Sequence, residues 1–157
     1  MVSKLFRKIL IATDGSEYTK KAVDHGIELA NNNGAKIHAI YVIDTSAYGS
    51  IPLSAPMEYA YSLLRQEGDM AIKYVADRAE VAGLEAEGII VEGHPAEEII
   101  KYAEENSIDL ILIGTLGKSG LDRFLLGSVA DKVIRNSKIP VIAIPVKEKI
   151  ELPEELE

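Results

Sequence analysis

Residues 110–134 read LILIGTLGKSGLDRFLLGSVADKVI, and this stretch decides the fold class. It opens with Leu110–Ile113, a short and continuously apolar run that is typical of a strand buried on both faces of a parallel sheet. A glycine-rich segment comes next, and apolar residues then recur at helical spacing: Val129, Ala130, Val133 and Ile134. The stretch therefore predicts a strand, a loop and a helix, the repeating unit of α/β folds.

The same alternation extends over the rest of the chain. Four more short apolar runs are bounded by turn residues: Ile9–Ala12, Ile37–Ile43, Glu87–Val91 and Val141–Ile144. Stretches of helical period separate the successive runs, and the longest of them extends from Met57 to Ala82. Pro95 stands where the first turn of a helix tolerates proline, and Gly83 follows the long second helix as a stop. We expect five strands alternating with four helices.

The composition of the strands predicts their order in the sheet. The first, second and fourth runs are apolar enough for interior positions, whereas the third, EAEGIIVEG, carries glutamates that protect a sheet edge. The fifth run is flanked by Pro140 and Pro145, which also suits an edge. The order 3-2-1-4-5 fits best. It reverses direction between strands 1 and 4, where open α/β sheets bind ligands at the strand carboxyl ends.

Length and composition indicate one domain, residues 1–146, followed by a charge-rich tail, residues 147–157. The sequence has 0 Cys, no apolar stretch near the ~20 residues of a membrane span and no secretory leader pattern, so we expect a cytoplasmic protein. The longest irregular piece, Asp44–Pro56, fits either a lid or a surface loop. A formal net charge of -8 argues against binding to nucleic acid or anionic membranes.

Two loops should meet at the switch point, and both carry suitable chemistry. After strand 4, Gly114 and Gly117 allow backbone to approach a ligand, and Gly127-Ser128 opens a helix whose first N–H groups lack partners. Phosphate oxygens would satisfy those donors. After strand 1, the carboxylate of Asp14 can accept hydrogen bonds from ribose hydroxyls. The predicted ligand has an anionic end and a sugar-like end.

The spacing Gly114-x-x-Gly117, nine residues, then Gly127-Ser128 resembles the G-2x-G-9x-G-S/T signature of ATP-binding universal stress proteins. The similarity covers nearly the whole chain, from KILIATDGSE through VIDTS to VIAIP. The resemblance implies a Rossmann-like, three-layer α/β/α fold with a five-stranded parallel sheet. This agrees with the strand order argued above.

The resemblance also implies a role for each matching position. Asp14 would hold the ribose beside Ala12, and Val42 would meet adenine through its backbone. The ribose and triphosphate would be surrounded by Ile113, Gly114, Gly117, Gly127, Ser128 and Val129. The cofactor would be ATP, with Mg²⁺ held by phosphates and waters. Ala12 and Leu116 depart from family members that have Pro and His there; the second departure removes a polar group from the loop.

Structural interpretations compete with these roles. GKS at 117–119 lacks the glycine that a Walker A loop requires at Leu112. Ser128 with Asp131 is an ordinary capping pair, and Asp14-Gly15 fits a plain turn. Lys118 and Arg123 could neutralise phosphate or simply be solvated. The three histidines have no partners at metal-ligand spacing, so we expect neither a structural metal nor a Ser-His-Asp triad: His25, His38 and His94.

The sequence favours an ATP-binding stress-response regulator or sensor with slow or no ATP hydrolysis, because no residue stands out as a general base. No catalytic residue is assigned, and weak ATPase activity is the upper limit. An adenylating enzyme of the ATP-pyrophosphatase class is the first alternative, although its phosphate loop resembles SGGxDS and this chain has TDGSEYT. A nucleotide-free dimeric interaction module is the second. We expect a homodimer through strand 5, and a downstream protein partner that the sequence does not identify.

Overall fold

The computed structural model describes residues 5–46, 54–116 and 126–145. Strands and helices alternate along the chain: β1 (Lys8–Ala12), α1 (Glu17–Asn33), β2 (Lys36–Asp44), α2 (Ala55–Val81), β3 (Ala86–Gly93), α3 (Pro95–Glu105), β4 (Leu110–Gly114), α4 (Ser128–Asn136) and β5 (Val141–Ile144). The five predicted strands and four predicted helices are confirmed.

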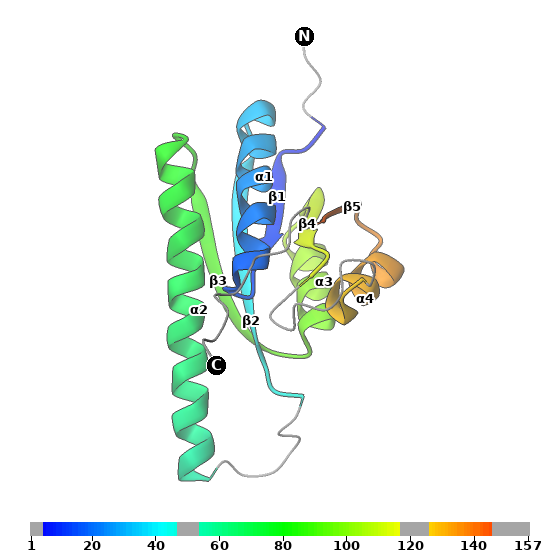
Figure 1. Ribbon diagram of the computed structural model, residues 1–157. Coiled ribbons are helices and arrows are strands. Elements are labelled where there is room, and N and C mark those ends of the chain that lie inside the picture. The colour runs from blue at the N-terminus through cyan, green and yellow to red at the C-terminus, as the bar shows by residue number, and fades with distance from the viewer. Residues whose placement is uncertain (1–4, 47–53, 117–125, 146–157) are drawn as a thin grey trace, which may run out of the picture.

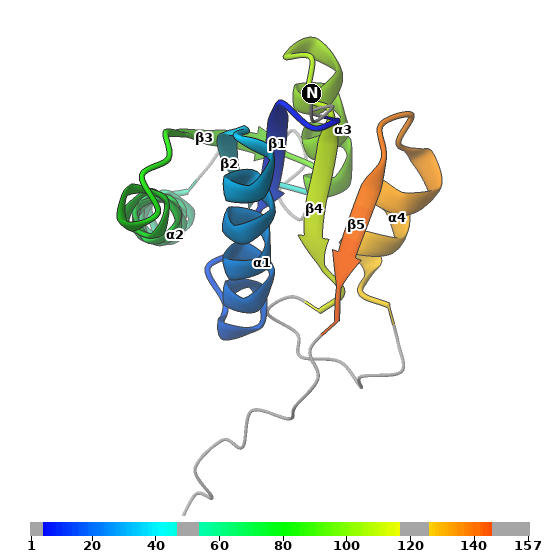
Figure 2. The ribbon, with the colours of Figure 1, turned by 90° about the horizontal axis from the view of Figure 1, so that it is seen from above.

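The strands form one parallel sheet in the order β3-β2-β1-β4-β5, as predicted. Helices α1 and α2 pack on one face of this sheet, while α3 and α4 pack on the other (Figures 1 and 2). The chain steps outward from β1 to β3 and resumes on the other side of β1 with β4. The carboxyl ends of β1 and β4 therefore diverge into connections on opposite faces, which leaves a crevice between them.

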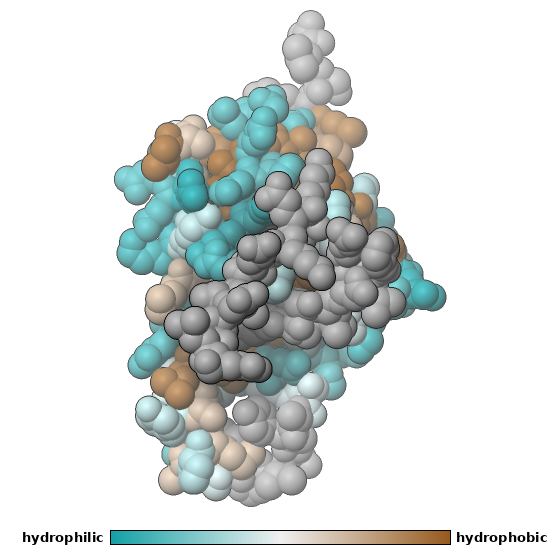
Figure 3. Space-filling view, viewed as in Figure 1, coloured by the Kyte–Doolittle hydropathy of each residue, from teal (hydrophilic) through white to brown (hydrophobic). Residues whose placement is uncertain are grey.

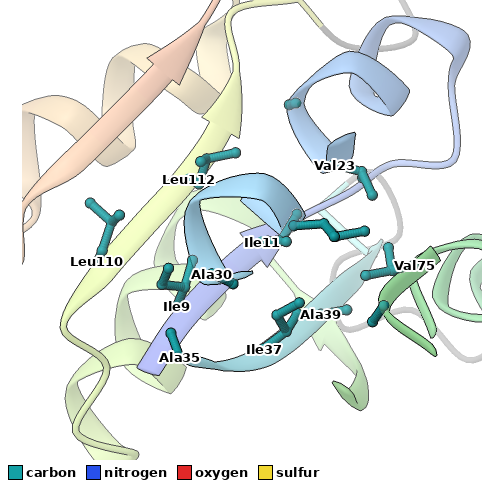
Figure 4. Close-up of a cluster of buried hydrophobic side chains, with 13 residues drawn as sticks. Ile9, Ile11, Val23, Ala30, Ala35, Ile37, Ala39, Val75, Leu110 and Leu112 are labelled. Carbon is teal, nitrogen blue, oxygen red and sulfur yellow. The ribbon is translucent and has the colours of Figure 1, made fainter. Parts of the chain in front are cut away.

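A hydrophobic core holds these layers together. The larger cluster brings together side chains of β1, β2 and β4 with those of α1 and α2, and they point toward one another in Figure 4. Ile9, Ile11 and Ile37 are among its fully buried members, and each buried side chain of this size contributes about 1.5–3 kcal/mol. Alternate residues of the same strands, such as Leu10 and Ile40, form a second cluster under α3 and α4. Burial on both faces explains the continuously apolar strands.

Helix α2 is longer than the sequence pattern indicates. It begins at Ala55, with Pro56 in its first turn, and β2 extends to Asp44. The irregular piece predicted over Asp44–Pro56 is therefore too long at both ends, because proline is tolerated in a first helical turn. Residues 47–53, and with them any lid, lie outside the described residues.

The 27 residues of α2 span about 40 Å, so its beginning extends past the carboxyl ends of the strands (Figure 1). In the space-filling view of the same face, separate apolar patches interrupt a largely hydrophilic surface along this side of the molecule (Figure 3). Among the described large hydrophobic residues, Val81 and Met70 of α2 are the most exposed. Among the described helices, none is long and apolar enough to cross a membrane.

Candidate functional site

A cavity of ≈ 370 Å³ lies at the carboxyl ends of β1, β2 and β4, at the predicted switch point. Its volume falls in the range of small-molecule sites, roughly 300–1,000 Å³. The beginnings of α3 and α4 also line it through Pro95 and Ser128, and α2 contributes Leu64 from its extended part. With Thr19 of α1, seven elements from different parts of the sequence surround one cavity.

The structure brings nearly all of the predicted site residues to this cavity. Eight of the nine line it: Ala12, Asp14, Val42, Ile113, Gly114, Gly127, Ser128 and Val129. The ninth, Gly117, lies outside the described residues, as do Lys118 and Arg123. Shared lining does not establish which ligand these residues touch, so their individual roles remain predictions.

Asp14 lies in a turn that links β1 to α1. Its Oδ1 accepts hydrogen bonds from the backbone N–H of Ser16 (2.9 Å) and from the hydroxyl of Thr19 (3.2 Å). Gly15 has a φ of 79°, in the left-handed region that favours glycine, and this conformation turns the chain into α1. The predicted turn is therefore present, and Ser16 rather than Asp14 is the residue that precedes α1. Asp14 serves in the turn and also faces the cavity.

The beginning of α4 presents backbone donors to the same cavity. The N–H of Gly127 donates to Thr115 O (2.7 Å), and Asp131 N–H donates to Gly127 O (2.9 Å) as the first helical bond. The N–H groups of Ser128, Val129 and Ala130 therefore belong to the first turn, where no preceding helical carbonyl can accept from them. The partial positive charge of a helix N-terminus adds to these donors.

Ser128 does not act as the predicted cap. Gly127 occupies the capping position of α4 without a side-chain hydrogen bond, and Asp131 instead accepts from Arg135 Nε (2.8 Å). The capping-pair interpretation is wrong because the helix begins at Ser128 rather than after it. A Cβ on Gly127 would lie 2.9 Å from Thr115 O, so this position requires glycine to close the loop.

The cavity has an apolar slot and a polar rim. Ile40 and Val42 of β2 face Ile99 of α3, and Leu116, which is buried, adds another apolar surface. Leu116 is thus part of the wall, consistent with its departure from histidine. Among the described lining residues the carboxylates are Asp14 and Asp44, and no lysine, arginine or histidine joins them. The donors that these described residues offer to an anion are backbone N–H groups and hydroxyls.

Sequence reasoning missed several lining residues. Thr13 and Thr19 are buried polar residues beside Asp14, and Tyr41 and Leu64 form the wall toward α2. Thr13 directly precedes the aspartate and could have been suspected, since polar residues ending a buried strand often serve a site. Thr19 and Leu64 lie on helices, and only tertiary packing brings them to the cavity.

The described residues contain no group of three or more His, Cys, Asp or Glu side chains arranged to hold a metal ion. His38 is buried in the sheet, where its Nδ1 lies 2.8 Å from the hydroxyl of Tyr102. His25 and His94 lie on α1 and before α3. None of the three lines the cavity.

Comparison with known proteins identifies the family and agrees with the fold. The family model for the universal stress protein family matches residues 5–145. Universal stress protein MJ0531 of Methanocaldococcus jannaschii is 42% identical over 145 residues, which cover 92% of this chain and 85% of that protein.

Two solved structures extend the comparison. Protein MJ0577 of the same organism superposes with a TM-score of 0.80 at 31% identity, covering 92% of this chain and 99% of that one. A universal stress protein in complex with cAMP superposes with a TM-score of 0.64 at 28% identity, covering 90% and 98%. By the match of its whole folded region and by its identity to these relatives, the chain belongs to the universal stress protein family.

Proposed function

We propose that this protein is a cytoplasmic stress-response regulator that binds ATP and changes its protein partner according to nucleotide occupancy. One observation carries the proposal: a single cavity collects the first-turn N–H donors of α4, the Asp14 carboxylate and an apolar slot. A nucleotide has the three matching parts, namely phosphates, a ribose and a base.

The phosphate end of the ligand would lie against α4. Its first-turn N–H groups, on Ser128, Val129 and Ala130, suit the oxygens of a phosphate chain. These donors need no cationic side chain, which reconciles an anionic ligand with a net charge of -8. Mg²⁺ would be held mainly by phosphate oxygens and water.

The nucleoside would occupy the other part of the cavity. Asp14 would accept hydrogen bonds from ribose hydroxyls, and the slot between Ile40, Val42 and Ile99 would hold a flat base. The binding of cAMP by a universal stress protein of the same fold supports an adenine nucleotide. ATP rather than a monophosphate is favoured by the donors at α4 and by the glycine spacing that ends at Gly127-Ser128.

The described lining supports slow hydrolysis. Phosphoryl transfer needs compensation for charge on the transferring group and a residue that positions water. The described lining offers Asp14 and Asp44 but no cationic side chain. We therefore propose a binding protein with at most weak ATPase activity.

Substitution Ser128→Asp tests the site sharply. A carboxylate at the first position of α4 stabilises the helix by about 0.3–1 kcal/mol, yet it lies beside the proposed phosphates and repels them. We expect calorimetry to give a micromolar dissociation constant for Mg-ATP with the unaltered protein, and at least about a tenfold weaker one for the variant. Thermal unfolding should show no loss of stability.

Asn32→Asp is the matched control, because it adds the same charge at the exposed far end of α1. Its affinity for ATP should equal that of the unaltered protein. If Ser128→Asp and Asn32→Asp bind ATP equally well, the phosphates do not lie at the N-terminus of α4. Absence of ATP binding by the unaltered protein would contradict the function and favour a nucleotide-free interaction module.

The same protein samples can distinguish the proposed regulator from an adenylating enzyme. An enzyme of that class releases pyrophosphate from ATP, whereas the proposed regulator releases none. The loop after β1 reads TDGSEYT, with Gly15 as its one glycine, so it lacks the glycine-rich cradle of that class. A sustained release of pyrophosphate would replace our proposal with the enzymatic one.

A further inference from the structure

Two buried threonine hydroxyls connect to the Asp14 carboxylate. Thr13 ends β1 and is 8% exposed, while Thr19 lies on the first turn of α1 and is 5% exposed. Their Oγ1 atoms lie 3.3 Å apart. Thr19 Oγ1 is also 3.2 Å from Asp14 Oδ1 and 2.9 Å from Ser16 O. Both side chains line the cavity, yet the function proposed above gives neither of them a role.

The hydroxyl protons can form a continuous series of donors in this network. Gly15 N–H donates to Thr13 Oγ1 (3.2 Å), so Thr13 accepts there and keeps its own hydroxyl proton to donate. Thr19 Oγ1 is the acceptor within reach of that proton. Thr19 then donates its one hydroxyl hydrogen bond to Asp14 Oδ1 or to Ser16 O, and the charged carboxylate is the stronger acceptor. In this arrangement, donors run from the Gly15 N–H, through the two hydroxyls, to the carboxylate.

The chain of donors fixes the orientation of Asp14. Oδ1 accepts from both Ser16 N–H and Thr19, and two donors on one oxygen oppose rotation of the carboxyl group about its Cβ–Cγ bond. An oriented acceptor binds ligand hydroxyls more tightly than a rotating one, because less conformational freedom is lost on binding.

We infer that Thr13 and Thr19 are positioning residues that hold the Asp14 carboxylate in the geometry for ribose, and that they give the site its preference for nucleotides with ribose hydroxyls. The inference rests on the proposed nucleotide site. Thr13 and Thr19 would affect ligand binding through Asp14, without touching the ligand themselves.

A helical role alone explains Thr19 incompletely. A threonine hydroxyl near a helix start commonly bonds a carbonyl three residues back, which is the contact with Ser16 O. That contact accounts neither for the approach to Asp14 nor for the buried Thr13 hydroxyl beside it. Burying two hydroxyls is costly unless hydrogen bonds satisfy them, and here these bonds converge on the carboxylate.

The experiment compares ATP with 2′,3′-dideoxy-ATP, both with Mg²⁺, by calorimetry. The unaltered protein should prefer ATP. Thr19→Val keeps the shape but removes the hydroxyl, and we expect it to weaken ATP binding roughly threefold to tenfold while dideoxy-ATP changes less than about twofold. Thr19→Ser keeps the hydroxyl and should retain the preference. Thr13→Val, at the start of the chain of donors, should lower the preference in the same direction.

The ratio of the two affinities separates positioning from stability. A merely structural loss would weaken both ligands alike, so an unchanged ratio in folded Thr19→Val and Thr13→Val overturns the inference. In an Asp14→Ala background, Thr19→Val should leave the ratio unaltered, and a further drop there would also contradict it. If the unaltered protein binds both ligands equally, the ribose role fails while nucleotide binding survives. If it binds neither, the proposed function fails as well.

Discussion

His38 is a buried titratable side chain far from the carboxyl ends of the strands. Its Nδ1 meets the Tyr102 hydroxyl at 2.8 Å, and its Nε2 is buried without a hydrogen-bond partner among the described atoms. Burial lowers the pKa of His38 below its ordinary value of 6.5, against the opposing effect of Glu87, whose Oε2 lies 3.8 Å from Nδ1. Lys36 and Lys8 lower this pKa further.

This environment predicts a loss of stability in acid. The unfolded chain takes up a proton on His38 near pH 6.5, whereas the folded protein takes it up only at lower pH, so protonation favours unfolding. The contribution of His38 to the free energy of unfolding should be complete above about pH 6.5 and should be lost as the pH falls through the pKa of the folded state. Denaturant titrations between about pH 7.5 and 5.5 measure the decline.

His38→Leu should flatten this part of the pH dependence, since it removes the titrating group. His25→Gln is the control, because His25 is an exposed histidine on α1, and its variant should keep the slope of the unaltered protein. Equal slopes in all three proteins would show that His38 does not carry the effect.

The residues at the site divide into those that sequence alone can predict and those that it cannot. Gly127 and Ser128 were predictable because the glycine pattern requires them at fixed spacing, and Asp14 because it lies in the loop after the first strand. Thr19 was not, since its partner Thr13 is brought to it by the turn and by packing of α1 on the sheet. The capping interpretation of Ser128 failed because a pattern of two polar residues does not fix where a helix begins.

Helix α2 reaches the cavity because a glycine lets it approach the sheet. A Cβ on Gly68 would lie 2.8 Å from Cδ1 of Tyr41, a buried ring of β2 that lines the cavity. The neighbouring residue Glu67 also contacts this ring, since the Tyr41 hydroxyl donates to Glu67 Oε2 (3.2 Å). The close approach of this helix and strand therefore depends on a missing side chain.

Gly68→Val should destabilise the protein by about 2 kcal/mol, because overpacking a close helix–strand contact outweighs the gain in helix propensity. Chemical denaturation measures this difference. Met70→Ala on the same helix is the control: Met70 is 74% exposed, and its variant should stay within about 0.5 kcal/mol of the unaltered protein. Equal stability of the two variants would mean that the Tyr41 ring moves aside without cost.

The helices and strands themselves could be predicted from the alternation of apolar and helical segments and from the glycines and prolines at their ends. Gly83 ends α2 with a φ of 72°, and Pro95 begins α3, both as expected. The start of α2 was misplaced because Pro56 was interpreted as a loop residue. That α2 lines the cavity could not be predicted, because no local pattern encodes how far a helix extends past a sheet.

For the whole molecule, the strand order followed from charge and burial. The glutamates of β3 placed it at one edge and the prolines around β5 placed that strand at the other, as the structure confirms. The edge at β5 remains apolar, and all four of its residues are only half-buried. We propose that a second copy of the chain covers this edge and forms the homodimer.

The direction of the backbone groups provides a test. Ile111 N–H donates to Pro140 O and Thr115 N–H donates to Ile144 O, so in a parallel ladder the backbone of Ala143 faces away from β4. Ala143→Pro should remove an outward donor and convert a dimer to a monomer in sedimentation, while preserving the bonds to β4. Ala143→Gly keeps the N–H and should stay dimeric. A monomeric unaltered protein at high concentration would refute the dimer.

The bond between Gly127 N–H and Thr115 O has an evolutionary consequence. It joins the two ends of the connection between β4 and α4 at 2.7 Å. Additional residues between these two ends therefore need not change the positions of β4 and α4. Doubling the length of a closed loop costs only about 0.6 kcal/mol in chain entropy. Insertions and grafts between these anchors can therefore diversify what the molecule recognises, while the sheet beneath them continues to fold unchanged.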